Sequence, residues 1–286
     1  MLKLLACLFM LIDHTGVLLI PPADPALYLA MRIVGRLAFP IFAYSVAVGF
    51  TRTRSPYRYL LRMALWAVIT ELVIKGTVLL TDTSFTDVWK RIDFNVWTNV
   101  MVTFTFAIVM LGGIEIALRS YRDRVASLRL IAAAPGGPHG SDRFGVRFNP
   151  GGLSFPPALG IPLGVVLVVF SFFAVTWLNS DYDVFGLLTV LVFFIPLRIW
   201  PVSAETGDTS RDARRIAQVV GLILLNVVWI EFAGMYWIEL FSVCALPLIL
   251  VRWPDRKPTQ VAKYFFYVFY PVHFALLVLL KYALKA

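Results

Sequence analysis

The chain has 286 residues and a formal net charge of +9; 59% of its residues are hydrophobic and 15% are charged. Soluble domains are typically about 45–50% apolar and about 25% charged, so this composition excludes an ordinary soluble protein. The basic residues are not interleaved with aromatic residues in a soluble segment, as a nucleic-acid surface requires. We therefore attribute the positive charge to cytoplasmic loops of a membrane protein, and expect no nucleic-acid partner.

Nine apolar segments follow one another along the chain, most of them near the length of about 20 residues that spans a bilayer. They are Leu2–Ile20, Leu27–Phe50, Tyr57–Leu80, Asn95–Leu118, Phe155–Leu178, Val184–Trp200, Ile216–Phe232, Tyr236–Val251 and Tyr264–Leu280. The first is expected to be a retained span, because no Ala-x-Ala-like cleavage site follows it. The sequence predicts an all-α, polytopic integral membrane bundle of about nine transmembrane helices, forming a single domain over residues 1–286.

The segments that connect these spans alternate in charge. Arg and Lys gather in 51–56, in 119–154, after Trp200 and after Val251, whereas 21–26, 81–94, 179–183 and 233–235 carry few or balance them with Asp. Because basic loops stay in the cytoplasm, we predict a cytoplasmic N-terminus and an external C-terminus. The Pro and Gly residues at 132–140 and 150–152 indicate a flexible cytoplasmic loop at about 119–154.

Several ionisable residues fall inside the predicted spans. A charged group at the bilayer centre costs about 2.5–3.5 kcal/mol, so these residues should face the bundle interior and have partners. They are Asp13, His14, Arg36, Glu71, Lys75, Glu239 and His273. Glu71 and Lys75 have the i, i+4 spacing of a helical ion pair, and we interpret them as a structural pair.

Three of these residues are predicted to meet at one depth. At about 1.5 Å per residue, His14 lies roughly 18 Å into the first span. By the same rise, Arg36 lies roughly 14 Å from the outer end of the second span, and His273 roughly 14 Å into the last. Asp13 points about 100° away from His14 on the helix, so we expect it to contact His273 or to pair with Arg36.

Two prolines lie close to these residues. Proline has no backbone N–H, so Pro40 cannot donate to the carbonyl of Arg36, and Pro271 cannot donate to that of Tyr267. We expect a freed carbonyl and a kink beside the candidate site, although such kinks are also ordinary features of membrane helices.

Blocks of sequence near both ends of the chain resemble the TraX family. Asp13-His14-Thr15-Gly16 closes the first block, and Asn95 with Thr98 resembles the family's Asn motif. Asp181-Tyr182 with Gly186 is similar to its Asp-Tyr-Gly block, with Asp183 in place of a usual glycine. The other matching blocks are Gly35–Tyr44 with Gly49-Phe50, and Phe265–Phe274, which contains Tyr270-Pro271-Val272-His273. The resemblance covers nearly the whole chain except 119–154.

The resemblance implies an acetyltransferase of the bacterial inner membrane. TraX is associated with N-terminal acetylation of the pilin used in conjugation, with acetyl-CoA as donor. The family also looks related to type-3 membrane acyltransferases, which carry a basic residue eleven positions before a histidine in the first span; Lys3 and His14 have this spacing. Because TraX-like proteins also occur outside conjugation, the acceptor here is a peptide, a glycan or a small molecule.

Acyl transfer from a thioester needs a general base, an oxyanion stabiliser and a grip on the CoA phosphates. We predict that the catalytic residues are His14 as the base, Asp13, Arg36 and His273. The predicted substrate- and cofactor-binding residues are Lys3, Arg52, Arg54, Arg58, Asn95, Asp181, Tyr182 and Tyr270. The three arginines are assigned to the phosphates because Arg makes bidentate phosphate contacts, although their charges also fit a role in topology. No metal is expected.

Two other classes of protein remain open from the sequence. The first is a membrane transporter or proton-coupled channel in which the buried Asp, His and Arg residues relay protons. The second is a haem protein with His14 and His273 as axial ligands. Release of free CoA from acetyl-CoA separates the acyltransferase from the transporter.

Overall fold

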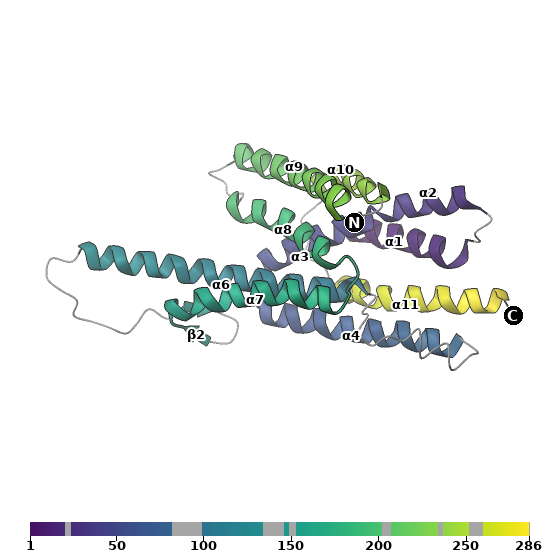
Figure 1. The fold of residues 1–286 in the computed structure, drawn as a ribbon, viewed down its shortest axis with the longest axis horizontal. Helices are drawn as coiled ribbons and strands as arrows, with labels where there is room; N and C mark the ends of the chain where they lie inside the picture. The colour runs from purple at the N-terminus through teal and green to yellow at the C-terminus, as the bar shows by residue number, and fades with distance from the viewer. Residues whose placement is uncertain are drawn as a thin grey trace.

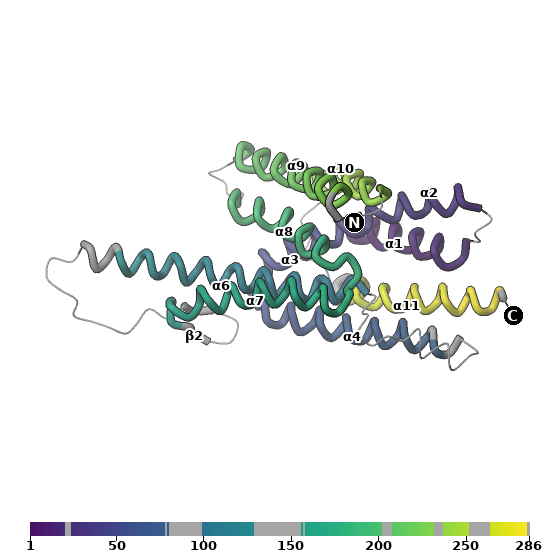
Figure 2. Tube along the Cα trace, in the orientation of Figure 1, coloured from purple at the N-terminus to yellow at the C-terminus, as the bar shows by residue number. Residues whose placement is uncertain are grey.

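The computed structural model describes residues 1–20, 24–81, 99–133, 146–148, 153–201, 207–233, 237–251 and 260–285 (Figure 2). Within them the chain is almost entirely helical. The helices are α1 (Leu2–Leu19), α2 (Pro25–Gly35), α3 (Ala38–Arg52), α4 (Pro56–Thr81), α6 (Val100–Ala133), α7 (Pro157–Trp177), α8 (Asp183–Ile199), α9 (Gly207–Ala233), the 3-10 helix η1 (Trp237–Ala245), α10 (Leu246–Leu250) and α11 (Gln260–Lys285). Each of the nine predicted segments contains helix, so the predicted helical fold class is confirmed.

Six of the described helical stretches are long and apolar enough to cross a membrane. They are Leu2–Leu19, Pro25–Arg52, Val100–Leu128, Ala158–Trp177, Asp208–Glu231 and Tyr264–Leu284. Large apolar side chains cover the outside of α7, where Val166, Phe173 and Trp177 are each at least 60% exposed. A helix that is apolar all round and still exposed matches a lipid-facing surface.

The structure departs from the sequence prediction in four places. The second predicted span, expected to be kinked beside Arg36, is divided into two helices, because α2 ends at Gly35, five residues before Pro40. The eighth is η1 followed by α10, where Pro247 occupies the first turn; proline is tolerated there. Residues 119–133 are helical rather than loop, since they are rich in the helix formers Arg, Leu and Ala. Within the predicted loop, β1 (Val146–Phe148) and β2 (Leu153–Phe155) pair as two short antiparallel strands, which leaves the helical fold class unchanged. The rest of the Pro- and Gly-rich part of 119–154 lies outside the described residues.

The molecule is elongated, and its helices run roughly along its long axis (Figure 1). Figure 1 shows α6 and α7 extending toward one end of this axis and α1, α2 and α11 toward the other, with α3 near the middle. The N-terminus lies near the middle of the axis and the C-terminus at one end. The depth of about 18 Å expected for His14 is therefore measured from a helix start that lies near the middle of the molecule and not at one of its ends.

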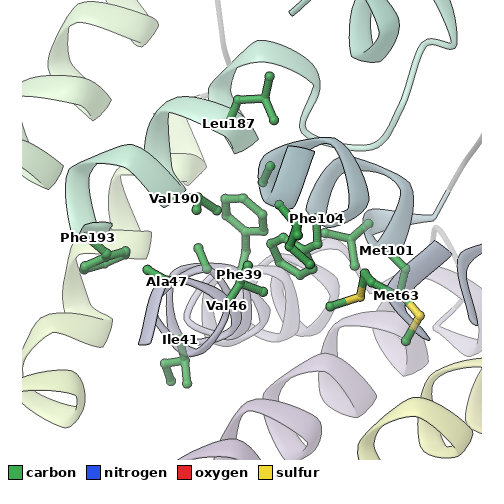
Figure 3. Packing of buried hydrophobic residues seen from close by; sticks show 14 of the residues in the cluster. Phe39, Ile41, Val46, Ala47, Met63, Met101, Phe104, Leu187, Val190 and Phe193 are labelled. Atoms are coloured by element: carbon green, nitrogen blue, oxygen red, sulfur yellow. The ribbon is translucent and has the colours of Figure 1, made fainter. Parts of the chain in front are cut away.

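The best-buried apolar side chains lie between α3, α8 and α6 (Figure 3). Ile41 of α3 and Phe193 of α8 are completely buried, and Phe39 and Phe104 stack with ring centroids 5.8 Å apart. This core holds α3 in place, and α3 begins two residues after Arg36. The core therefore fixes one end of the candidate site.

Helices α6 and α7 approach each other through glycines. A Cβ atom added to Gly113 of α6 would lie 2.7 Å from the backbone oxygen of Gly164 in α7, whereas one added to Gly112 would meet nothing within 4 Å. Small residues at such crossings let helix backbones pack closely. The two adjacent glycines thus have different roles, and only Gly113 is required by packing.

We expect Gly113→Ala to lower the melting temperature of the purified protein and Gly112→Ala not to lower it. The first forces α6 and α7 apart, at a cost of about 1–3 kcal/mol, while the second only replaces glycine with a better helix former. Thermal unfolding in detergent measures both. Equal melting temperatures for the two variants would contradict this packing.

Candidate functional site

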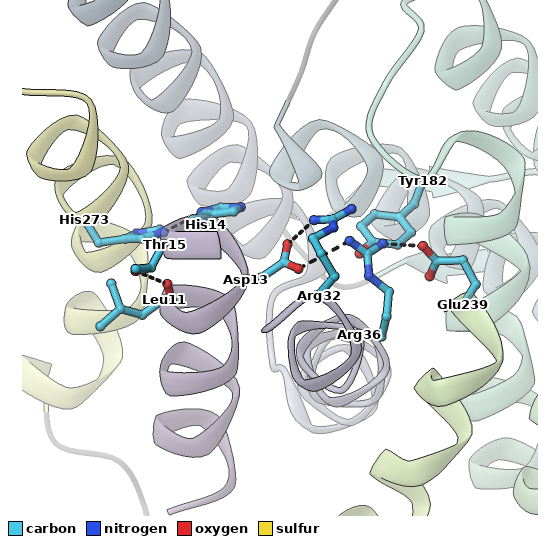
Figure 4. Close-up of polar contacts among 9 residues, drawn as sticks. All are labelled: Leu11, Asp13, His14, Thr15, Arg32, Arg36, Tyr182, Glu239 and His273. Carbon is cyan, nitrogen blue, oxygen red and sulfur yellow. Dashed lines mark hydrogen bonds and ion pairs between the residues drawn. The ribbon is translucent and has the colours of Figure 1, made fainter. Parts of the chain in front are cut away.

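Two neighbouring residues of α1 point to different helices (Figure 4). His14 faces α11, where it meets His273, and Asp13 faces α2 and α3, where it meets Arg32 and Arg36. This divergence follows from the 100° rotation between adjacent helical residues. Of the two predicted partners for Asp13, the structure selects Arg36 and not His273.

The two histidines form a direct pair. Nδ1 of His14 lies 2.7 Å from Nε2 of His273, and the two rings are parallel within 4°. Phe269 stacks on the other side of His273, and Tyr270 and Phe274 meet His14 edge-on. His273 is buried and His14 half-buried, so the pair is enclosed by apolar rings but retains some access through His14.

The hydrogen bonds define which nitrogen of each histidine carries a proton. Nδ1 of His273 lies 2.8 Å from the backbone oxygen of Phe269. A carbonyl only accepts, so this Nδ1 is the donor and, in a neutral ring, Nε2 of His273 is the acceptor. His14 must then donate through Nδ1. The remaining nitrogen, Nε2 of His14, is left with a free lone pair.

Asp13 belongs to a cluster of four charges, of which Arg32 is half-buried and the other three are buried. Its two carboxylate oxygens lie 2.7 Å from Nη1 of Arg32 and 3.5 Å from Nη2 of Arg36. Arg36 also pairs through Nη1 with Glu239 of η1, and the hydroxyl of Tyr182 lies 3.5 Å from the same nitrogen. Two guanidinium groups and two carboxylates give no net formal charge. Neutral, mutually paired charges are the form in which burial is tolerated.

The helix break places Arg36 in this cluster. Arg36 and Leu37 form the turn between α2 and α3, and Pro40 in the first turn of α3 leaves the carbonyl of Arg36 without its usual donor. Gly35 permits the close approach of α1, since a Cβ atom there would collide with the side chain of Asp13. The prediction of a break beside Arg36 is thereby confirmed. In contrast, α11 continues through Pro271.

Tyr182 reaches Arg36 from a strained turn between α7 and α8. Its φ is 63°, and Asn179 and Asp183 also have positive φ. Such values are uncommon for residues other than glycine and persist only where the surroundings enforce them. The ring of Tyr182 stacks on Phe39 with centroids 3.7 Å apart, which holds it there.

The other predicted site residues are dispersed. Tyr270 is buried against both histidines. Asp181 lies in the turn beside Tyr182, and its backbone oxygen accepts a hydrogen bond from Thr103. Asn95 lies outside the described residues. Of the remaining four, Lys3 lies over the ring of Phe266, Arg54 lines a cavity at the far end of α3, and Arg52 and Arg58 are exposed.

Lys3 shares a face of α1 with His14. Eleven residues correspond to about three turns, and both side chains contact α11. Their separation along the axis is about 16 Å, so Lys3 does not belong to the histidine pair.

Arg32 is a member of the charge cluster that the sequence did not single out. It lies four residues before Arg36, so the helical period places both on one face, and this spacing indicates a shared environment. Glu71 and Lys75 form the predicted pair, with Nζ 3.1 Å from the carboxylate. Asn99 also donates to Glu71; no sequence spacing connects these two residues.

Fold and site together define a helical protein of membrane type with a buried, charge-balanced cluster next to a histidine pair. The profile of the family described as TraX protein matches residues 1–139. The TraX resemblance is confirmed for this stretch, which contains Asp13, His14, Arg32 and Arg36. No curated protein and no solved structure matches the chain.

We expect Asp13→Asn to destabilise the protein strongly. It leaves Arg32 and Arg36 with a single carboxylate, and removing one partner of a buried pair costs about 3–5 kcal/mol. The control is Asp24→Asn at the exposed start of α2, where the Asp24 side chain accepts from the N–H of Leu27. Asn caps helices as well as Asp does, so only the first variant should lower the melting temperature. A similar effect of both would contradict the cluster's structural role.

Proposed function

We propose that this protein is a membrane-embedded acetyltransferase that moves an acetyl group from cytoplasmic acetyl-CoA to an amine or hydroxyl of an acceptor. The observation that carries the proposal is the hydrogen-bonded series from Phe269 through His273 to His14, which ends in an unprotonated nitrogen. The TraX match over residues 1–139 supports the choice of acetyl-CoA as donor. The acceptor is a pilin N-terminus, another peptide, a glycan or a small molecule.

In this mechanism, His14 is the general base. Its Nε2 takes the proton of the acceptor N–H or O–H as the acceptor attacks the thioester carbonyl. The C–S bond then breaks, and the proton on His14 passes to the sulfur, so that the products are the acetylated acceptor and free CoA. His273 accepts from Nδ1 of His14, which orients the ring and stabilises the positive charge that His14 carries between the two steps.

Arg36 is proposed to stabilise the oxyanion that forms at the carbonyl. Its Nη atoms are occupied by Asp13, Glu239 and Tyr182, but its buried Nε has no hydrogen-bond partner. Buried donors without partners are rare in proteins and call for an explanation. A developing oxyanion is a suitable acceptor, because preorganised donors contribute most where charge appears during the reaction. Asp13 and Glu239 act by holding Arg36 in place.

We also propose the topology that the sequence predicts. Nine spans with a cytoplasmic N-terminus agree with the charge of the loops, and the bacterial inner membrane is the location that the TraX resemblance implies. The α3–α4 junction with Arg54 then faces the cytoplasm, where acetyl-CoA is made. Arg52 and Arg58 are exposed near this junction and remain candidates for contacts with the CoA phosphates.

A proton-coupled transporter is the second candidate, because the same histidine pair is suited to passing protons. The haem alternative is disfavoured by the geometry, since an iron with both histidines as axial ligands would lie between nitrogens that are in direct contact. Transport would acidify or alkalinise vesicles without consuming acetyl-CoA, so the two functions are separable.

His14→Ala is expected to reduce acetyl transfer by about 10²–10⁴-fold, the usual contribution of a general base. The assay follows transfer of labelled acetyl from acetyl-CoA to cell extract and to a pilin N-terminal peptide, together with release of free CoA. His273→Gln should retain more activity than His273→Leu, because the Gln oxygen can accept from His14. His139→Ala, the third histidine of the chain, serves as the control. Full activity in His14→Ala would refute its assignment as the base.

A further inference from the structure

A second polar site lies at the opposite end of α3 from Arg36 and its charge cluster. It is a cavity of about 340 Å³ between the α3–α4 junction, α6 and the end of α8, a size within the range of small-molecule sites. Its lining is Phe50, Thr51, Thr53, Arg54, Pro56, Glu115, Arg119, Phe194, Leu197, Arg198 and Pro201. Three arginines from three different helices or junctions thus face one cavity.

Glu115 holds two of these arginines in a fixed orientation. One of its carboxylate oxygens lies 2.6 Å from Nε of Arg198, and the other lies 3.4 Å from Nε of Arg119. Because both arginines are bound through Nε, the Nη ends of their guanidinium groups remain for a ligand. Paired N–H groups of this kind match the oxygens of a phosphate.

The cavity carries an excess of positive charge. Three arginines against Glu115 leave a formal charge of +2, and Arg54 forms no ion pair with the described residues. The N-terminal end of α4, at Pro56, also borders the cavity, and helix N-termini attract anions. Phe50 and Phe194 also line the cavity, and these apolar rings would exclude water from part of its wall.

We propose that this cavity binds the phosphate groups of the acyl donor, with Arg119 and Arg198 as binding residues beside Arg54. The assignment of the donor rests on the proposed acetyltransferase function, while the phosphate chemistry rests on the cavity itself. The 15 residues of α3 span about 22 Å between the cavity and Arg36. A CoA thioester suits this separation, because its long pantetheine arm lies between the phosphates and the reacting carbonyl.

The experiment measures binding of CoA, without an acetyl group, to the full chain in phosphatidylcholine nanodiscs by calorimetry. Arg198→Gln and Arg54→Gln should each raise the Kd about tenfold or more, as expected for lost hydrogen bonds to a charged group. Arg54→Gln breaks no ion pair among the residues that the structure describes, and so keeps the test valid if Arg198→Gln folds poorly. The control is Arg124→Gln, which removes the same charge from an exposed position roughly 140° around α6 from Arg119.

Each outcome decides the proposal. Equal CoA affinity in wild type and both cavity variants, or an equal loss in Arg124→Gln, overturns it. Loss of CoA binding when the discs contain phosphatidylglycerol assigns the cavity to a lipid headgroup and overturns the donor assignment. Arg198-dependent CoA binding without any acetyl transfer leaves the cavity as a phosphate site and refutes the proposed function. If acetyl transfer depends on His14 but the KM for acetyl-CoA is unchanged in Arg198→Gln, the assignment of the cavity to the donor phosphates is refuted and the proposed function is not.

Discussion

The ion pair between Asp13 and Arg36 is the interaction on which the rest of the site depends. In apolar surroundings each charge is costly unless it is paired, and Asp13, Arg32, Arg36 and Glu239 solve this jointly by balancing one another. The cluster joins α1, the α2–α3 turn and η1, which are distant in sequence. Because Asp13 is fixed against Arg36, the helical period turns His14 about 100° around α1 from Asp13, where α11 supplies His273.

The histidine pair and the charge cluster are therefore coupled through one turn of α1. A shift of Asp13 would move His14 relative to His273 and lengthen the 2.7 Å hydrogen bond between them. The strained turn at Tyr182 contributes to the same arrangement, since its ring stacks on Phe39 at the start of α3. Strain of this kind is concentrated at functional sites, where surrounding contacts maintain it. A small displacement of Asp13 is thus expected to alter the hydrogen bond between the two histidines.

Helix α3 connects the two polar regions of the molecule. Its first residues follow Arg36, its last residues border the arginine-lined cavity, and its middle is buried against α6 and α8. A well-packed helix keeps a constant length, so the separation of the two regions is set by the fold. An extended donor that engages both ends would be positioned by α3, and a compact ligand would occupy only one of them. The length of α3 therefore sets the length of a substrate that can contact both regions.

The sequence by itself determined the apolar segments, because burial in lipid requires long runs of apolar residues whatever their neighbours are. It also determined the Glu71–Lys75 pair and the break beside Arg36, since helical spacing and the missing N–H of Pro40 act locally. Only the tertiary structure decided that Asp13 pairs with Arg36 rather than His273, that Arg32 and Glu239 complete the cluster, and that Glu115 unites Arg119 with Arg198. These contacts join residues up to 203 positions apart, and a one-dimensional pattern contains no information on the rotation of one helix relative to another.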